Sequence, residues 1–180
     1  NREFYRSDDQ LLCISKQTKN LVENVLRDFP KPGRIKYVPH GIDERKFFPV
    51  TNDFEFEAFK EKIIGKEEMD FVVLWNSRNI RRKNPSDIIL AWRTFLDQLP
   101  VEQAKKCMLL MKTEAVFAHL PHFLYLPSEF QDHILFQLLR VKIVHERFDE
   151  KNLNYLYNCS DAHMFMTDNE GWGLGLTESL

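Results

Sequence analysis

Short apolar runs alternate with helical patterns through the second half of the chain, and this alternation limits the fold more than any other feature. The runs have the length of buried strands and lie at residues 71–75, 107–111, 141–144 and 162–166. Strands that alternate with helices are typical of parallel sheets with helices on both faces. The sequence therefore predicts an α/β fold with a Rossmann-like parallel sheet.

Start and stop signals place the helices between these strands. Pro85 is expected to begin a helix with Asn84 as its N-cap, and a second helix is expected over residues 149–158. The buried face of the first helix is an apolar stripe made of Ile88, Ile89, Trp92, Phe95, Leu96 and Leu99. Between residues 113 and 139 the pattern is less decisive, and only its end, residues 130–139, suggests a helix.

The first 65 residues repeat the same rhythm on a smaller scale. Residues 10–15 and 34–39 read as short strands, and a helix between them is expected to start at the cap Ser15 and to stop at the Pro-Lys-Pro-Gly sequence 30–33. A further amphipathic helix is predicted over residues 54–65.

The composition limits the classes of binding partner and indicates the cellular compartment. The 180 residues are 43% hydrophobic, which suffices for one core or for parts of two domains. A formal charge of -2 provides no field for nucleic acid or an anionic membrane, so a phosphate ligand needs a local cluster of cations. Three widely spaced cysteines predict reduced, buried thiols and a cytoplasmic location. The sequence has no transmembrane run.

A glycine-rich turn follows the apolar run 162–166 and is expected to open a helix. Its glycines, Gly171, Gly173 and Gly175, would let backbone approach a ligand, and helix-terminal N–H groups would face a phosphate. Two carboxylates, Glu170 and Glu178, flank the turn. The alternative interpretations are that the glycines serve only tight strand–helix packing and that Glu178 is a surface helix residue.

A second loop carries the charge that an anion would need. Residues 76–84 follow the strand at 71–75 and place four cations in six positions: Arg78, Arg81, Arg82 and Lys83. Ligands of open α/β sheets bind at the carboxyl ends of the strands, so both loops are expected to converge on one anion. The alternative is a solvated loop with no ligand. Three histidines, His119, His122 and His133, match no common metal-ligand spacing.

These motifs, in this order, resemble those of the retaining glycosyltransferases of family 4, which have the two-domain GT-B architecture. The resemblance rests on Ser77-Arg78 with Lys83 five residues on, and on Glu170-Gly171-Trp172-Gly173-Leu174 with Glu178 eight residues after the first glutamate. The sequence Val38-Pro39-His40-Gly41-Ile42-Asp43, followed by Phe48-Pro49, is similar to the family's interdomain passage. Three departures are Ser77, Asn84 and His40, which stand where the family usually has glycine, glycine and asparagine.

The resemblance implies a role for each of these residues. Arg78 and Lys83 would bind the diphosphate of a nucleotide-sugar donor, and Glu178 would hydrogen-bond its ribose. Glu170 would lie against the donor sugar as the catalytic carboxylate. The loop Gly171, Trp172, Gly173 and Leu174 would bind the donor, with the backbone of its first three residues on the sugar hydroxyls.

The resemblance also implies the organisation of the chain. Residues 1–50 would be the last strands and helix of an N-terminal Rossmann-like domain with the interdomain linker, and residues 51–180 a truncated C-terminal donor-binding domain. The chain would thus be incomplete at both ends and inactive by itself.

The expected activity is transfer of a sugar, of hexosyl type, from a UDP- or GDP-sugar to a glycan, lipid or small-molecule acceptor, with retention of configuration. No Asp-x-Asp pair is placed for a metal, so metal independence is expected, and no cofactor beyond the donor substrate. Two alternatives remain open: another GT-B enzyme such as a sugar-nucleotide epimerase, and a nucleotide-sugar-binding module without catalysis.

Overall fold

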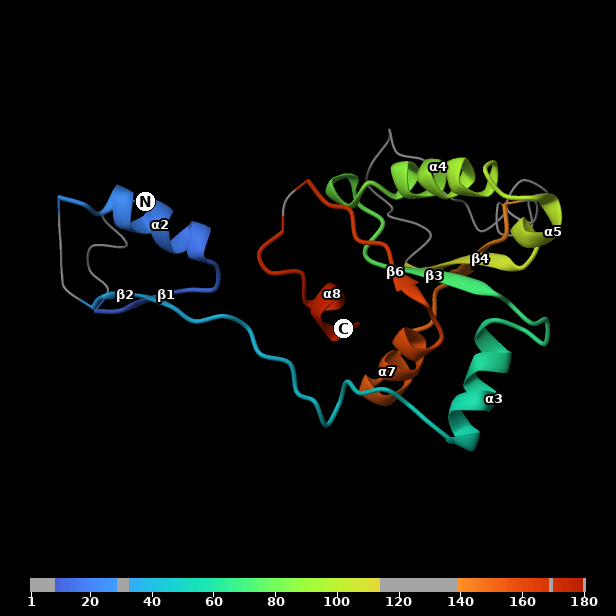
Figure 1. Cartoon of the computed structure of the whole chain (residues 1–180). Helices are drawn as coiled ribbons and strands as arrows, with labels where there is room; N and C mark the ends of the chain where they lie inside the picture. Colours follow the sequence, from blue (N-terminus) through green and yellow to red (C-terminus); the bar gives the residue numbers. More distant parts are fainter. Residues whose placement is uncertain (1–8, 29–32, 114–138, 169, 180) are drawn as a thin grey trace. The chain divides into compact units, whose positions relative to one another are not determined.

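A computed structural model describes residues 9–28, 33–113, 139–168 and 170–179 of the chain (Figure 1). Its contacts divide the chain into two compact units. The smaller unit comprises Asn1–Ile42 with Glu170–Leu174, and the larger unit comprises Asp43–Asn169 with Gly175–Leu180.

The smaller unit contains a parallel strand pair joined through a helix. Strand β1 (Leu11–Cys13) pairs with β2 (Ile35–Tyr37), and α2 (Lys16–Val25) connects them. The Ser15 hydroxyl caps this helix by accepting a 3.0 Å hydrogen bond from the Thr18 backbone N–H, as the sequence predicts. The predicted stop at 30–33 is described only at Gly33, whose φ of 71° requires a residue that tolerates the left-handed region.

The larger unit is built on a four-stranded parallel sheet. Its strands are β3 (Phe71–Asn76), β4 (Cys107–Lys112), β5 (Val141–Val144) and β6 (Ala162–His163), in the spatial order β5-β4-β3-β6. The predicted α/β class with a Rossmann-like parallel sheet is confirmed.

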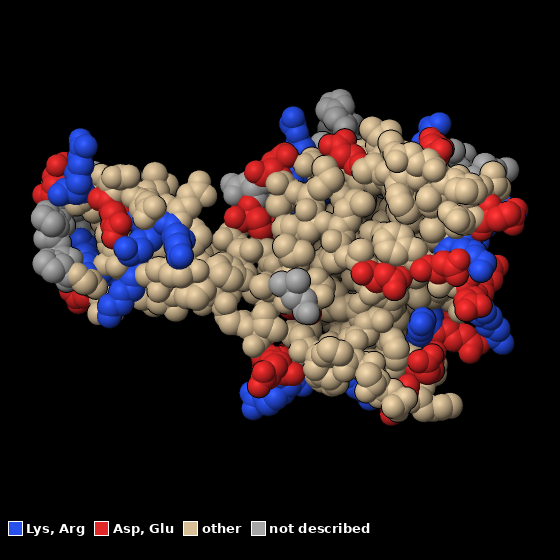
Figure 2. All heavy atoms as spheres, viewed as in Figure 1, with Lys and Arg blue, Asp and Glu red and all other residues tan. Residues whose placement is uncertain are grey.

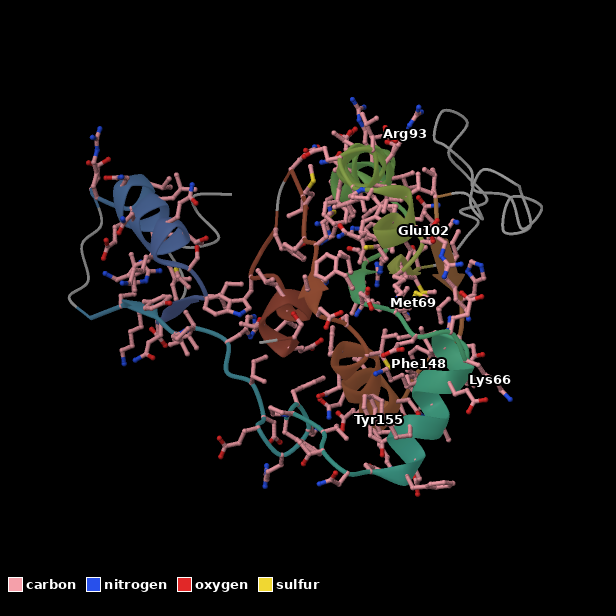
Figure 3. The ribbon with its side chains drawn as sticks, turned by 45° about the vertical axis from the view of Figure 1, so that its right-hand side comes forward. Lys66, Met69, Arg93, Glu102, Phe148 and Tyr155 are labelled. Atoms are coloured by element: carbon pink, nitrogen blue, oxygen red, sulfur yellow. The ribbon has the colours of Figure 1, made fainter. Side chains whose placement is uncertain are left out.

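Helices cover both faces of this sheet because side chains alternate along β3. Val72 and Leu74 face α3 (Phe54–Ile63) and α7 (Glu150–Asn158), whereas Val73 and Trp75 face α4 (Pro85–Leu96). Figure 3 shows Phe148 and Tyr155 beside α3, where both rings contact Phe59.

The helices predicted from Pro85, over residues 149–158 and over residues 54–65 are present, although α4 ends at Leu96, before Leu99 of the predicted stripe, and one predicted cap is corrected. Helix α4 begins at Pro85 and buries Ile88, Trp92 and Leu96, and Asp149 caps α7 through the Asn152 backbone N–H at 2.8 Å. Asn84 occupies the N-cap position of α4 in a left-handed conformation (φ 46°), but its side chain makes no capping hydrogen bond. The side chain is directed elsewhere, to Asp168, as described below.

Strand β6 is shorter than the predicted run at 162–166. Among the described strands it pairs with β3, at Val73 and Leu74, and this ladder ends after the bond from Met164 N–H to the Leu74 carbonyl. Met166 is 40% exposed, so the last apolar residues of the run were wrongly read as strand. The helix suggested at residues 130–139 lies largely outside the described residues.

Two asparagines of α7 fix the passage that leads into the larger unit. Asn154 exchanges two hydrogen bonds of 3.1 Å with the backbone of Phe48, and Asn158 accepts from the Val50 N–H at 2.8 Å. This passage groups by its contacts with the larger unit. A domain boundary at residue 50 stays a prediction.

Three short helical elements complete the described chain: the η1 turn (Arg81–Lys83), α5 (Val101–Ala104) and α8 (Leu174–Glu178). Within the described residues, none of the helices has the length and hydropathy needed to cross a membrane. On the face of the larger unit seen in Figure 2, basic and acidic groups are intermixed.

Candidate functional site

The strand order places a topological switch point beside β3. From β3 the chain proceeds outward through β4 to β5, and then returns to the other side of β3 as β6. In open parallel sheets, ligands bind outside the carboxyl ends of the two strands where the order reverses. In this chain those strand ends lead into the loop 77–84, which the sequence selects, and into residues 164–168, which precede the predicted glycine turn.

Backbone and side-chain bonds join these two loops within the larger unit. The Asp168 N–H donates to the Arg82 carbonyl at 2.9 Å, and the Asn84 amide Nδ2 donates to Asp168 Oδ1, also at 2.9 Å. The loop after β3 and the residues that follow β6 therefore meet at one edge of the sheet. Asn84 contributes to this junction through its side chain, which explains why that side chain does not cap α4. The predicted convergence of the cation loop with the glycine turn at residues 170–175 stays a prediction.

Lys83 is the cation that the loop junction holds most firmly. It is only 8% exposed, and its ammonium Nζ lies 4.9 Å from the ring centre of Phe165, in the loop after β6. An aromatic face attracts a cation and offsets part of the cost of burying it. The η1 turn therefore presents a positive charge at a fixed position beside the switch point.

Arg78 has the opposite environment. It follows β3 directly and is exposed, and its guanidinium makes no hydrogen bond or ion pair with the part of the chain that the structure describes. Its backbone carbonyl accepts a bond from Ile80 N–H at 2.9 Å, which tightens the loop. The guanidinium is thus available for a ligand, with the planar donor geometry that matches phosphate oxygens.

Glu178 lies near the end of β3 and is held by a tyrosine. Tyr157 of α7 donates from its hydroxyl to Glu178 Oε2 at 2.8 Å, and Asn76, the last residue of β3, donates from Nδ2 to the same hydroxyl at 2.9 Å. Burial and then the Glu178 carboxylate raise the pKa of Tyr157 above its ordinary value, so the hydroxyl stays protonated at neutral pH. Glu178 is therefore not a simple surface helix residue.

His163 lies in β6 and packs against the end of α8. Its Nδ1 lies 2.7 Å from the Ser179 hydroxyl, which donates its single proton to the Leu176 carbonyl at 2.8 Å, so Nδ1–H is the donor to Ser179. Burial lowers the pKa of this imidazole. His163 fixes the end of α8, in keeping with the packing role that its strand position predicts.

The glycine turn groups with the smaller unit through residues 170–174. There, the Trp172 ring lies edge-on to His40 with ring centres 5.8 Å apart, which joins the turn to the sequence 38–43 that resembles an interdomain passage. Gly173 has a φ of 88°, a conformation that glycine adopts easily because it has no Cβ atom. Glu170 is half-buried.

A short helix, α8, follows the turn and spans Leu174–Glu178. Gly175, within α8, passes close to the end of β3: a Cβ there would lie 3.8 Å from the Asn76 carbonyl and 3.6 Å from the Tyr157 hydroxyl. Arg78, Lys83 and Glu178 therefore belong to one unit, and Glu170 and residues 171–174 to the other.

Sequence reasoning missed three residues of this site. Tyr157 looks like an ordinary apolar position of an amphipathic helix, Asn76 looks like the end of a strand, and Asp168 looks like a loop residue. The one available signal was a polar residue, Asn76, at the carboxyl end of a strand beside the switch point. Among the described residues, no group of three or more His, Cys, Asp or Glu side chains is arranged to hold a metal ion.

Comparisons with known proteins agree on the fold. No protein-family model matches the chain. The chain is 32% identical over 76 residues, 42% of its own length and 18% of the relative's, to the Escherichia coli UDP-Gal:alpha-D-GlcNAc-diphosphoundecaprenol alpha-1,3-galactosyltransferase.

Two solved structures extend this agreement to almost the whole chain. A sucrose-phosphate synthase from Thermosynechococcus elongatus matches 99% of the chain with a TM-score of 0.62 and 20% identity. A trehalose-6-phosphate structure from Escherichia coli, bound with UDP-2-fluoro glucose, matches 99% with a TM-score of 0.68 and 15% identity. The chain spans 40% and 44% of these proteins. Its fold is that of GT-B glycosyltransferase structures.

Proposed function

We propose that the protein is a GT-B glycosyltransferase that moves a hexosyl group from a nucleotide-diphosphate sugar to an acceptor, with retention of configuration and without a metal. The observation that carries this proposal is the junction at the switch point. A buried lysine on Phe165 and an exposed arginine follow β3, and the loop after β6 is bonded to the same turn. Cations gathered there, in a chain of net charge -2, suit a dianionic or trianionic ligand.

The donor diphosphate would bind Arg78 and Lys83. Lys83 provides a positioned point charge, because its ammonium is buried against Phe165, and Arg78 provides a mobile guanidinium that can close on the phosphate oxygens. Breaking the bond from sugar to diphosphate builds negative charge on the leaving phosphate. Both cations would stabilise that charge most strongly in the transition state.

The two glutamates would act at the other parts of the donor. Glu178, already oriented by Tyr157, would accept hydrogen bonds from the ribose. Glu170 would lie against the transferred sugar, where a carboxylate stabilises the positive character of an oxocarbenium-like carbon. Gly171, Trp172, Gly173 and Leu174 would complete the donor loop.

Similarity supports the donor class and leaves the acceptor open. The E. coli relative carries UDP-Gal in its name, and the trehalose-6-phosphate structure is bound with UDP-2-fluoro glucose. A UDP-sugar is accordingly the first donor to test, followed by GDP-sugars. The acceptor would be a glycan, a lipid or a small molecule, and the three buried cysteines, Cys13, Cys107 and Cys159, outside any disulfide, suit the cytoplasm that we propose as the compartment.

A panel of nucleotide sugars tests this proposal on the intact protein. Thermal unfolding is measured with each UDP-, GDP- and ADP-sugar, and with EDTA present and absent. A donor at 100 times its Kd stabilises the folded state by about 2.7 kcal/mol, which gives a clear rise in melting temperature. Stabilisation by at least one nucleotide sugar, unchanged by EDTA, is expected. If none of them shifts the melting temperature, the proposal is wrong.

A further inference from the structure

Tyr157 occupies a position that the proposed chemistry has not yet used. It lies on α7, is 6% exposed, and its hydroxyl is bonded to residues from two other elements, the end of β3 and α8. A buried hydroxyl needs hydrogen-bond partners, and here both partners lie at the switch point, one of them the Glu178 carboxylate of the candidate site. The contact also lies wholly within the larger unit.

The hydrogen positions in this chain of bonds follow from the chemistry of its members. A carboxylate at neutral pH only accepts, so Tyr157 must donate its single proton to Glu178 Oε2. The hydroxyl can then only accept from Asn76, which fixes the Asn76 amide with Nδ2 toward the tyrosine. The bonds therefore run in one direction, from the end of β3 to the glutamate.

This arrangement leaves one oxygen of the glutamate for a ligand. Tyr157 occupies Oε2, and no other residue in the described ranges hydrogen-bonds the Glu178 carboxylate. A single anchored oxygen stops the carboxylate from rotating, so Oε1 keeps a fixed direction before a ligand arrives. Pre-orientation of this kind raises affinity because less conformational freedom is lost on binding.

We propose that Tyr157 is a positioning residue that holds Glu178 ready to accept hydrogen bonds from the ribose hydroxyls of a nucleoside diphosphate, and so makes the site selective for ribonucleotides. This proposal rests on the proposed function, because it takes the nucleotide donor as the ligand. It adds the means by which a ribose is told from a deoxyribose. A site built to bond a hydroxyl rejects an analogue without it, since its polar group is left unpaired.

Calorimetry with matched ligands and variants tests the proposal on the intact protein. UDP, GDP and ADP are titrated first, and the tightest binder is compared with its 2′,3′-dideoxy counterpart. Tyr157→Phe is expected to weaken the ribonucleotide about 5- to 10-fold, the effect of one hydrogen bond, and the dideoxy form less than about 2-fold. In a Glu178→Ala background, Tyr157→Phe should change neither affinity, because the two residues act as one unit.

Tyr155→Phe is the matched control. Tyr155 lies on the same helix two residues earlier, and its hydroxyl bonds Asp53 instead of the site. The Tyr155→Phe variant also removes one tyrosine hydroxyl, but away from the site, so its nucleotide affinities should equal those of the wild type. If Tyr157→Phe does not fold, Asn76→Ala replaces it: without its donor the tyrosine hydroxyl is free to turn, and a loss confined to the ribonucleotide is again expected.

Four results would overturn the proposal, and the first three of them leave the proposed function standing. Equal weakening of both ligands by Tyr157→Phe, or additivity with Glu178→Ala, makes the tyrosine structural while the nucleotide site stands. An unchanged affinity of Tyr157→Phe for the ribonucleotide would likewise exclude the positioning role and leave the nucleotide site standing. If the wild type binds none of the three nucleoside diphosphates, the proposed function fails and this proposal fails with it.

Discussion

The Lys83 ammonium lies 4.9 Å from the ring centre of Phe165, which joins the loop after β3 to the loop after β6. The two strands are neighbours although 86 residues separate Asn76 from Ala162, so the contact is a product of the strand order alone. The backbone bond between Arg82 and Asp168 repeats the connection. The cationic turn is consequently bonded to the loop after β6 at the switch point, and its Lys83 is buried there.

Removing Arg78 should weaken nucleotide binding without affecting the fold. Arg78→Ala is expected to cost about 1.5 to 3 kcal/mol of binding free energy for a nucleoside diphosphate, the range for charge-assisted hydrogen bonds. Its free energy of unfolding should change by less than about 0.5 kcal/mol, because the side chain is exposed and without a described partner. Calorimetry and urea unfolding measure the two quantities.

The control for Arg78 is Arg93→Ala. Arg93, labelled in Figure 3, is an exposed arginine on α4. It pairs with Asp97 one turn later. The variant removes the same charge away from the switch point, so it corrects for the net charge of the protein. Equal losses of affinity in the two variants would indicate a general electrostatic effect and no site at Arg78.

Variants of Lys83 and Phe165 should separate the effect of the charge on nucleotide affinity from the effect of packing on stability. Lys83→Met keeps the apolar stem and removes the charge, so nucleotide affinity should fall at least 10-fold, or about 1.4 kcal/mol. Phe165→Leu keeps the cation and should lower the free energy of unfolding by about 0.5 to 2 kcal/mol, with most of the affinity retained. If instead Lys83→Met binds nucleotide like the wild type, Lys83 is only a structural cation.

Glu170 should affect turnover much more than binding. Glu170→Gln removes the negative charge that would face the transferred sugar in the transition state, so kcat should fall at least 100-fold while the Kd of the nucleoside diphosphate changes less than about 3-fold. Glu102→Gln, an exposed glutamate on α5, is the control. Equal losses of kcat and of affinity in Glu170→Gln would assign Glu170 to binding only.

The Cys159 thiol should make the free energy of unfolding depend on pH, with a sign that follows from its pKa. Burial raises the pKa of this thiol to about 12, from an ordinary value of 9.0. The buried neutral thiol therefore contributes stability that is complete below pH 9 and is lost as the pH rises from 9 toward 12. We expect the stability difference between the wild type and Cys159→Ala to narrow across that interval in urea unfolding. A constant difference would mean that the thiol ionises in the folded protein as it does in the unfolded chain.

Much of the fold could be predicted because its signals are local. The run 71–75 is apolar throughout since β3 is buried on both faces, and Asp149 lies at the N-cap where α7 begins. The run 162–166 misled because apolar composition does not reveal where the pairing with β3 ends. Asn84 misled for a related reason: its side chain prefers a distant aspartate to the nearby backbone.

The candidate site was predictable only in part. Arg78, Lys83 and Glu178 were found through charge, spacing and resemblance, and the structure places all three in the larger unit. Tyr157 was not found, because it lies 21 residues from Glu178 and its helix pattern is that of a core residue. A hydrogen bond between distant elements produces no periodic pattern in the sequence, so only the three-dimensional arrangement reveals it.

Transfer of a labelled sugar is the most direct test of the proposed function. The intact protein is incubated with a nucleotide sugar that stabilises it, carrying a radiolabelled sugar, and with glycan, lipid and small-molecule acceptor fractions. The label should move to one acceptor class with the anomeric configuration of the donor, and transfer should survive EDTA. Label that stays on the nucleotide would point to a binding module, and label recovered in an epimerised sugar would point to an epimerase; either result would contradict a glycosyltransferase.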